Sequence, residues 1–257
     1  MPKSPPDDIT LKSGARLNRE TAEGNDDVRI FTTKNPQVRW PDGGIGHRLC
    51  RNQASMGARL EATPLQPSGP FYHPTEPLSI DNGLLYHQDP ESCADGEVIC
   101  IRGRLLDQTG KPIKEARIEI WQANAYGRYN HPRQANSNLP LDPNFFCFGH
   151  TLTGPEGHYR FRSIKPAPYP DSSEWLRPPH IHFAVIPEGG SPWSTKIYFA
   201  GEALNKRDFL RGYLLSDAAR ERVIVDLQTT ENAPDARAKL GEFDIVLGMP
   251  GVTHDKS

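Results

Sequence analysis

The second half of the chain consists of short runs in which hydrophobic and polar residues alternate. A period of two places successive side chains on opposite faces and is typical of β-strands. Turn-forming glycines, prolines and aspartates separate the runs. We therefore predict strands over residues 97–105, 116–122, 158–164, 180–186, 195–199, 223–227 and 242–247. The one helix predicted in this half covers residues 217–222, with Ser216 as its N-cap.

The spacing of these elements indicates the fold class. Short strands joined by turns, without long helices that could connect parallel strands, predict an all-β protein built as a β-sandwich. Residues 1–65 have poor hydrophobic periodicity, with only loose helical spacing between His47 and Leu60. We therefore expect residues 1–65 to form an irregular N-terminal extension and residues 66–257 to form the sandwich domain. The PSGPFY sequence at residues 67–72 predicts an ordered turn.

Composition and charge exclude several classes of partner. The chain of 257 residues carries 30 Lys and Arg against 32 Asp and Glu, and no basic face for nucleic-acid phosphates is visible. No apolar run approaches the roughly 18 residues of a transmembrane helix. The polar, proline-rich start lacks an apolar signal core, so we expect a cytoplasmic protein. No close CxxC pair occurs among Cys50, Cys93, Cys100 and Cys147, which disfavours a zinc ribbon. Without a signal core we expect these thiols to be reduced and buried.

Two histidines in one predicted strand are the strongest local sign of chemistry. His180 and His182 are two residues apart, so their side chains share a face and can reach one metal ion. The nearest carboxylates, Glu174 and Glu188, lie outside this motif, which disfavours a ferrous site with two histidines and a carboxylate. An ordinary pair of packed histidines is the alternative. A zinc or copper site could be completed by His131, His150 or His158.

Two tyrosines offer a different ligand set. Tyr129 follows a Gly-Arg pair, and Tyr169 lies between two prolines that hold it on a stiff, extended segment. Phenolate is a hard anionic donor, and a bound cation lowers the pKa of a phenol below its ordinary value of about 10. Two tyrosines and two histidines therefore suit a ferric ion. Spacing alone does not select them, because an aromatic lid or a packed loop residue is the plainer interpretation of Tyr169.

Longer motifs give a resemblance to a known family. They are IWQANAYGRYNH at residues 120–131, GHYRF at 157–161, PYP at 168–170, WLRPPHIHF at 175–183 and IYF at 197–199. Together they resemble the intradiol ring-cleaving dioxygenases over about residues 70–247, with the iron-bearing (beta) chains of the protocatechuate enzymes nearest in pattern. The resemblance implies a transthyretin-like β-sandwich. It also implies a non-haem ferric ion, Fe(3+), held by Tyr129, Tyr169, His180 and His182.

The resemblance further implies a reaction. Both atoms of O2 enter between the two hydroxylated carbons of a catechol, giving a cis,cis-muconate-type diacid. Tyr169 would help to accept a substrate proton, and Arg177 would stabilise negative charge that develops on the substrate. A homo-oligomer, or a hetero-oligomer with a related chain, is expected. A non-catalytic binding module of the same shape is the alternative from another class.

One departure from the family pattern bears on the substrate. Lys196 stands where the family usually has glutamine, two residues before Tyr198, and both residues are candidates for substrate binding. A lysine here suits a catechol with an acidic substituent, such as protocatechuate, and a solvated lysine is an equal alternative. Catechol and hydroxyquinol are the alternative substrates.

Overall fold

The computed structural model describes residues 59–72, 83–85, 94–171, 175–186, 192–208, 214, 216–230 and 237–248. All of them belong to one compact unit of the chain, residues 39–257. The expectations for residues 1–58, and for Cys50 and Cys93, lie outside the described residues. The two cysteines that are described, Cys100 and Cys147, are free and buried.

The first sheet is built around the long strand β1 (Val98–Asp107). Strand β4 (His158–Ile164) pairs with β1 in antiparallel register along its length. On its other side β1 pairs in parallel with β11 (Lys239–Glu242) and then with β12 (Ile245–Leu247). The short strand β10 (Gln228–Thr229) completes the sheet by pairing with β11.

The second sheet has the order β3-β2-β7-β8-β9. Its members are β3 (Phe148–Leu152), β2 (Arg117–Trp121), β7 (His180–Ile186), β8 (Trp193–Phe199) and β9 (Ile224–Val225). All neighbours are antiparallel except β8 and β9. A separate ribbon joins β5 (Tyr169–Pro170) to β6 (Leu176–Arg177). Within the described ranges, the helical pieces are η1 (Pro132–Gln134), η2 (Ala203–Lys206) and α1 (Asp217–Glu221).

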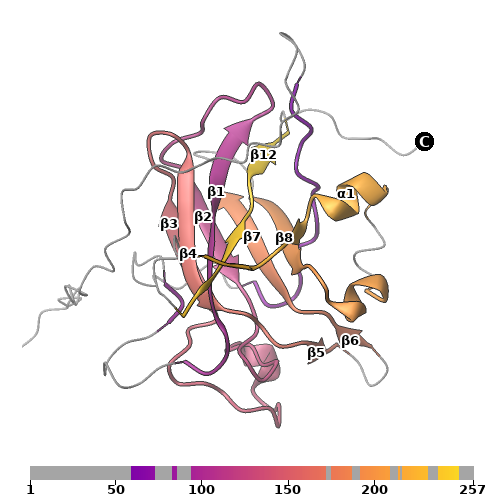
Figure 1. Ribbon diagram of the computed structural model, residues 1–257. Helices are drawn as coiled ribbons and strands as arrows, with labels where there is room; N and C mark the ends of the chain where they lie inside the picture. The colour runs from indigo at the N-terminus through magenta and orange to yellow at the C-terminus, as the bar shows by residue number, and fades with distance from the viewer. Residues whose placement is uncertain are drawn as a thin grey trace, which may run out of the picture. The chain divides into compact units, whose positions relative to one another are not determined.

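The two sheets lie face to face, as Figure 1 shows, and the hydrophobic core fills the space between them. Alternate residues of each strand point into this core. The first sheet contributes Ile99, Ile101, Leu105, Tyr159 and Phe161, and the second contributes Ile118, Ile120, Ile181, Phe183, Val185, Ile197 and Phe199. The expectation of an all-β sandwich is confirmed.

Several elements differ from the prediction. Strand β3 was absent from the prediction, because its sequence FGHTL does not alternate clearly. The predicted strand over residues 242–247 divides into the end of β11 and β12. The break coincides with a close approach in which the carbonyl oxygen of Phe243 would lie 1.7 Å from a Cβ on Gly103. Helix α1 ends one residue earlier than predicted, and Ser216 caps it through the amide of Ala219.

The outer face of the second sheet is also buried. Its strands carry Glu119, Trp121, His180, His182, Lys196 and Tyr198 on this face, and each is at most 3% exposed. A second, smaller cluster covers the face, formed by Trp121, Ala123, Tyr129, Tyr169 and Ala184 with Phe71 and Tyr72. This covered outer face is where the candidate functional residues meet.

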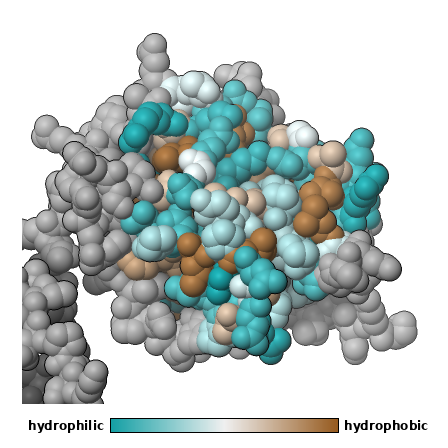
Figure 2. Space-filling model, turned by 90° about the horizontal axis from the view of Figure 1, so that it is seen from below, coloured by the Kyte–Doolittle hydropathy of each residue, from teal (hydrophilic) through white to brown (hydrophobic). Residues whose placement is uncertain are grey.

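The surface seen from below is mainly hydrophilic, with several separate hydrophobic patches (Figure 2). Over the described part of the chain, the large hydrophobic side chains that are exposed are Leu65, Tyr126, Leu141, Phe146, Leu152 and Leu176. Among the described helices, none has the length and apolar character needed to cross a membrane.

Candidate metal centre

His180 and His182 lie together on the outer face of β7. Their Nε2 atoms are 3.2 Å apart. The Nδ1 of His180 lies 2.7 Å from the carbonyl oxygen of Pro178, which can only accept, so Nδ1 carries the hydrogen and Nε2 keeps a free lone pair. Burial holds the pKa of both imidazoles well below the usual value, with Arg177 acting further on His180. Both rings are therefore neutral, the form that binds a metal ion.

Tyr129 is positioned by a tight turn that follows β2. The side-chain oxygen of Asn124 accepts hydrogen bonds from the amides of Tyr126 and Arg128, each at 2.9 Å. The amide of Tyr129 donates to the side-chain oxygen of Gln134 at 2.6 Å. These half-buried polar contacts fix the loop and direct the phenol of Tyr129 back over the second sheet, into the cluster that holds Tyr169.

Tyr169 reaches the same place from the β5–β6 ribbon. Its ring centroid lies 5.3 Å from that of Tyr129 and 5.5 Å from that of His180. The Tyr129 hydroxyl has no hydrogen-bond partner, and the Tyr169 phenol beside it helps burial to raise its pKa. The four predicted side chains, from one loop, the β5–β6 ribbon and strand β7, are thus brought together in one buried place.

Arg177 pairs with Tyr169 across the two strands of the β5–β6 ribbon. Its Nη1 donates to the Tyr169 hydroxyl at 3.4 Å, and its Nε forms a buried ion pair with Asp208 at 3.1 Å. Burial raises the pKa of Tyr169 to about 12, while the positive charge of Arg177 acts in the opposite direction. Burial also raises the pKa of Tyr129 well above its ordinary value. Both phenols therefore keep their protons at neutral pH unless a cation is added.

The donor chemistry fits a metal ion. A buried polar atom without a partner is costly, so several such atoms in one place indicate a bound group. The hydroxyl of Tyr129 and the Nδ1 of His182 have no hydrogen-bond partner, and two imidazole nitrogens face each other across 3.2 Å. Two phenols and two neutral imidazoles are hard and borderline donors, the combination that suits a trivalent or divalent transition metal.

The alternative of a zinc or copper site is wrong, because none of the three other candidate histidines is placed to join His180 and His182 around a metal ion. Across the described ranges, no group of three or more His, Cys, Asp or Glu side chains is placed to hold a metal ion. His158 lies on β4 in the other sheet, His150 pairs with Glu119 across β3 and β2, and His131 caps η1.

The two residues predicted to bind substrate face the same site. Lys196 lies opposite His182 and Tyr198 lies opposite His180 in the β7–β8 register. Lys196 is fully buried, and its Nζ has no hydrogen-bond partner. Burial, assisted by the charge of Arg177, lowers the pKa of Lys196 to about 8. A buried cation without a partner favours an anionic group of a ligand at this position.

Other residues of the site were not predicted. Gly69 has a φ of 77°, and a Cβ on it would lie 3.2 Å from Cε1 of His182. Phe71 stacks on Tyr129 with centroids 4.4 Å apart. Trp121 stacks on His182, and Asp208 pairs with Arg177. The only sequence signal for the first two was the turn predicted at residues 67–72.

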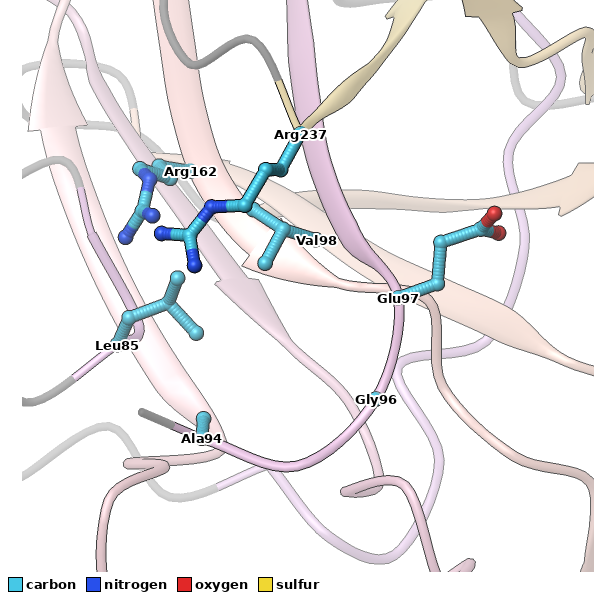
Figure 3. Close-up of a pocket in the computed structure, with 7 residues that line it drawn as sticks. All are labelled: Leu85, Ala94, Gly96, Glu97, Val98, Arg162 and Arg237. Atoms are coloured by element: carbon cyan, nitrogen blue, oxygen red, sulfur yellow. The ribbon is translucent and has the colours of Figure 1, made fainter. Parts of the chain in front are cut away.

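A separate cavity of about 250 Å³ lies beside the start of β1. Its walls include Leu85 and Val98, and the side chains of Arg162 and Arg237 extend toward one another there (Figure 3). It shares no lining residue with the cluster of tyrosines and histidines, so the candidate chemistry does not belong to it.

Comparisons with known proteins agree with this geometry. The family model described as Dioxygenase matches residues 68–249. The chain is 41% identical over 186 residues to the protocatechuate 3,4-dioxygenase beta chain of Burkholderia cepacia, a match that covers 70% of this chain and 72% of that protein. It is 30% identical over 208 residues to the catechol 1,2-dioxygenase of Acinetobacter baylyi, covering 72% of this chain and 61% of that enzyme.

A solved structure shares the fold. The crystal structure of 3-chlorocatechol 1,2-dioxygenase from Rhodococcus opacus 1CP superposes with a TM-score of 0.56 at 24% identity, covering 76% of this chain and 75% of that one. This likeness confirms the expected type of β-sandwich. The family match spans both phenols, both imidazoles and the strands that carry them. The chain belongs to the intradiol dioxygenase family.

Proposed function

We propose that this chain is a non-haem iron(III) intradiol dioxygenase that cleaves a catechol with an acidic substituent, protocatechuate being the first candidate. The proposal rests on one observation. Two phenols and two neutral imidazoles lie together in a buried cluster, next to a lysine that has no hydrogen-bond partner. Tyr129, Tyr169, His180 and His182 would hold the ferric ion. Two phenolates would balance most of its charge, which favours the +3 state.

A bound ferric ion would supply the Lewis acidity that withdraws electrons from a catechol and makes its ring reactive toward O2. The protein supplies proton transfer and positioning. With the ferric ion bound, Tyr169 would be a phenolate, and its oxygen is then the group that would take a proton from a substrate hydroxyl. The Arg177 guanidinium, 3.4 Å from that oxygen, would favour the phenolate form. Asp208 fixes that guanidinium, so Arg177 presents a preorganised positive charge to the reacting centre.

The proposed reaction balances without another reductant. A catechol and O2 combine, the bond between the two hydroxylated carbons breaks, and each carbon ends in one carboxyl group. The aromatic cover of Phe71, Tyr72 and Trp121 excludes bulk water from the outer face of the sheet.

Lys196 supports the choice of an acidic catechol. Its ammonium group is buried on the face of β8 that carries the site, and a carboxylate on the ring would supply the missing partner. Catechol and hydroxyquinol are the competing substrates, because relatives named for them also match the chain. Substrate binding by Tyr198, beside Lys196 on the same face, is part of this proposal.

Oxygen uptake and product analysis test the proposal. Iron-loaded protein is given protocatechuate, catechol or hydroxyquinol under 18O2. We expect one O2 consumed per substrate, two labelled oxygens in a muconate-type diacid, and the highest kcat/KM for protocatechuate. A higher kcat/KM for catechol than for protocatechuate would mean that the enzyme prefers a catechol without an acidic substituent. An iron-loaded protein that consumes no O2 with any of the three would indicate a non-catalytic binding module. We further propose that the chain forms a homo-oligomer, or a hetero-oligomer with a related chain, and light scattering on the same sample tests this.

A further inference from the structure

The two histidines of the candidate metal centre are supported in different ways. His180 donates from Nδ1 to the carbonyl of Pro178 at 2.7 Å, an outer hydrogen bond of the kind that usually orients a metal-binding histidine. The Nδ1 of His182 is buried and has no such partner. Some other contact must therefore hold the plane of the His182 ring.

Trp121 provides that contact. Its indole stacks on the His182 ring with centroids 4.8 Å apart and planes only 12° from parallel. The indole nitrogen of Trp121 makes no hydrogen bond, so packing alone keeps the indole in place. The ring of Tyr72 lies against the indole with centroids 4.7 Å apart and planes tilted by 43°. The plane of His182 thus depends on a stack of three rings, of which the outermost, Tyr72, is tilted.

A buried carboxylate anchors the outer end of this stack. The Tyr72 hydroxyl donates to Oε2 of Glu119 at 2.8 Å. Oε1 of Glu119 forms an ion pair with Nε of Arg117 at 2.7 Å. Glu119 is only 3% exposed, and the proposed reaction gives it no role. Residues 119 and 121 share one face of β2, so the anchor and the indole it supports belong to the same strand.

We propose that Glu119 is a positioning residue for His182: it fixes Tyr72, and Tyr72 holds Trp121 flat against the imidazole. The stack replaces the hydrogen bond that His182 lacks. This inference rests on the proposed function in taking His182 as a ligand of the ferric ion. It adds a residue that touches neither the metal nor the substrate and that acts through two aromatic rings.

The test removes the anchor in steps. Tyr72→Phe deletes one hydroxyl and keeps the ring, Glu119→Ala removes the carboxylate, and Glu119→Gln keeps an oxygen that can accept from Tyr72. Glu242→Gln is the matched control, because Glu242 pairs with Arg102 at 2.6 Å in the other sheet. Iron release to a chelator and the tyrosinate-to-iron absorption band are measured for each iron-loaded protein.

We expect Tyr72→Phe and Glu119→Ala to release iron about tenfold faster, the usual scale for loss of an outer contact to a metal ligand. Their absorption bands should shift or broaden. The double variant should be no worse than Glu119→Ala alone, because both changes break the same contact. Glu119→Gln should lie near the wild type, and Glu242→Gln should match it.

A second measurement separates this inference from the proposed function. Imidazole NMR signals of the metal-free proteins report the ring of His182 directly. We expect Tyr72→Phe and Glu119→Ala to shift or broaden the His182 signals and to leave those of His180 in place. If the wild type binds no iron, the proposed function fails while the NMR comparison still decides the role of Glu119. Unchanged His182 signals in both variants would overturn the inference, as would unchanged iron release in proteins that bind iron.

Discussion

The backbone of Gly127 passes so close to Pro168 that a Cβ on Gly127 would lie 2.6 Å from the Pro168 carbonyl oxygen. The same Cβ would lie 3.3 Å from Cβ of Tyr169. This contact presses the segment that carries Tyr169 against the turn that precedes Tyr129. A glycine with a φ of 80° is thus what allows two phenols from separate loops to meet.

The close approach predicts the effect of Gly127→Ala. The new methyl group must push the two segments apart, so the variant should lose bound iron as well as stability. Gly201→Ala is a matched control, because Gly201 also has a φ of 80° but no atom lies within 4 Å of its added Cβ. In both variants an alanine at positive φ should lower the free energy of unfolding by about 1 kcal/mol or more. Iron content and urea unfolding distinguish them, and equal iron loss in both would refute the role of the contact.

The ligand assignment makes its own prediction. Tyr129→Phe and His180→Ala each remove one donor, and we expect both proteins to lose bound iron and visible colour. Tyr126→Phe and His158→Ala are the controls, because these residues lie outside the donor cluster. Elemental analysis after iron-replete growth gives the result. Full iron content in both ligand variants would disprove the assignment.

Lys196 is expected to determine the preference for an acidic ring. Lys196→Gln removes the charge and keeps a polar side chain of similar length. Loss of a charge-assisted hydrogen bond should lower kcat/KM for protocatechuate by about tenfold or more. The value for catechol, which has no acidic substituent, should change much less. Steady-state kinetics with both substrates checks this. Equal decreases in kcat/KM for protocatechuate and catechol would mean that Lys196 does not contact the acidic substituent.

Tyr159 provides a prediction about pH that is independent of the metal. Its hydroxyl donates to the carbonyl of Phe243, and burial raises its pKa well above the ordinary value. The folded protein keeps this proton while the unfolded chain releases it above about pH 10. The stability that Tyr159 provides is therefore fully present below pH 10 and is lost as the pH rises further.

Urea unfolding of the wild type and Tyr159→Phe measures this effect. At pH 8 the wild type should be more stable by about 1 kcal/mol, the value of one hydrogen bond. Above pH 10 the difference should fall by up to about 1.4 kcal/mol for each pH unit. A difference that stays constant from pH 8 to pH 11 would contradict the assignment of a raised pKa.

The strict alternation of apolar residues explains why parts of the fold were predictable. Strands β4 and β7 have the predicted bounds, because one face of each strand enters the core while polar or functional residues occupy the other. Strand β3 has glycine and histidine at its centre, so local pattern could not reveal it. Its position depends on pairing with β2, a contact that lies outside its own sequence.

The site was predictable to a different extent. His180 and His182 follow from strand geometry, whereas the two tyrosines came from the family motifs and not from spacing. The role of Glu119 and Trp121 on the outer face of β2 was not predicted, because Phe71 and Tyr72 cover this face from about 50 residues earlier in the chain. The local sequence of a strand does not show contacts with residues that lie so far away along the chain.

The absorption spectrum of the purified protein tests the central claim most directly. It is recorded with an iron determination, before and after protocatechuate is added without oxygen. Phenolate coordination to ferric iron predicts a red-brown protein with about one iron per chain, and a band that shifts when the catechol binds. A colourless protein without iron after iron-replete growth would contradict the account.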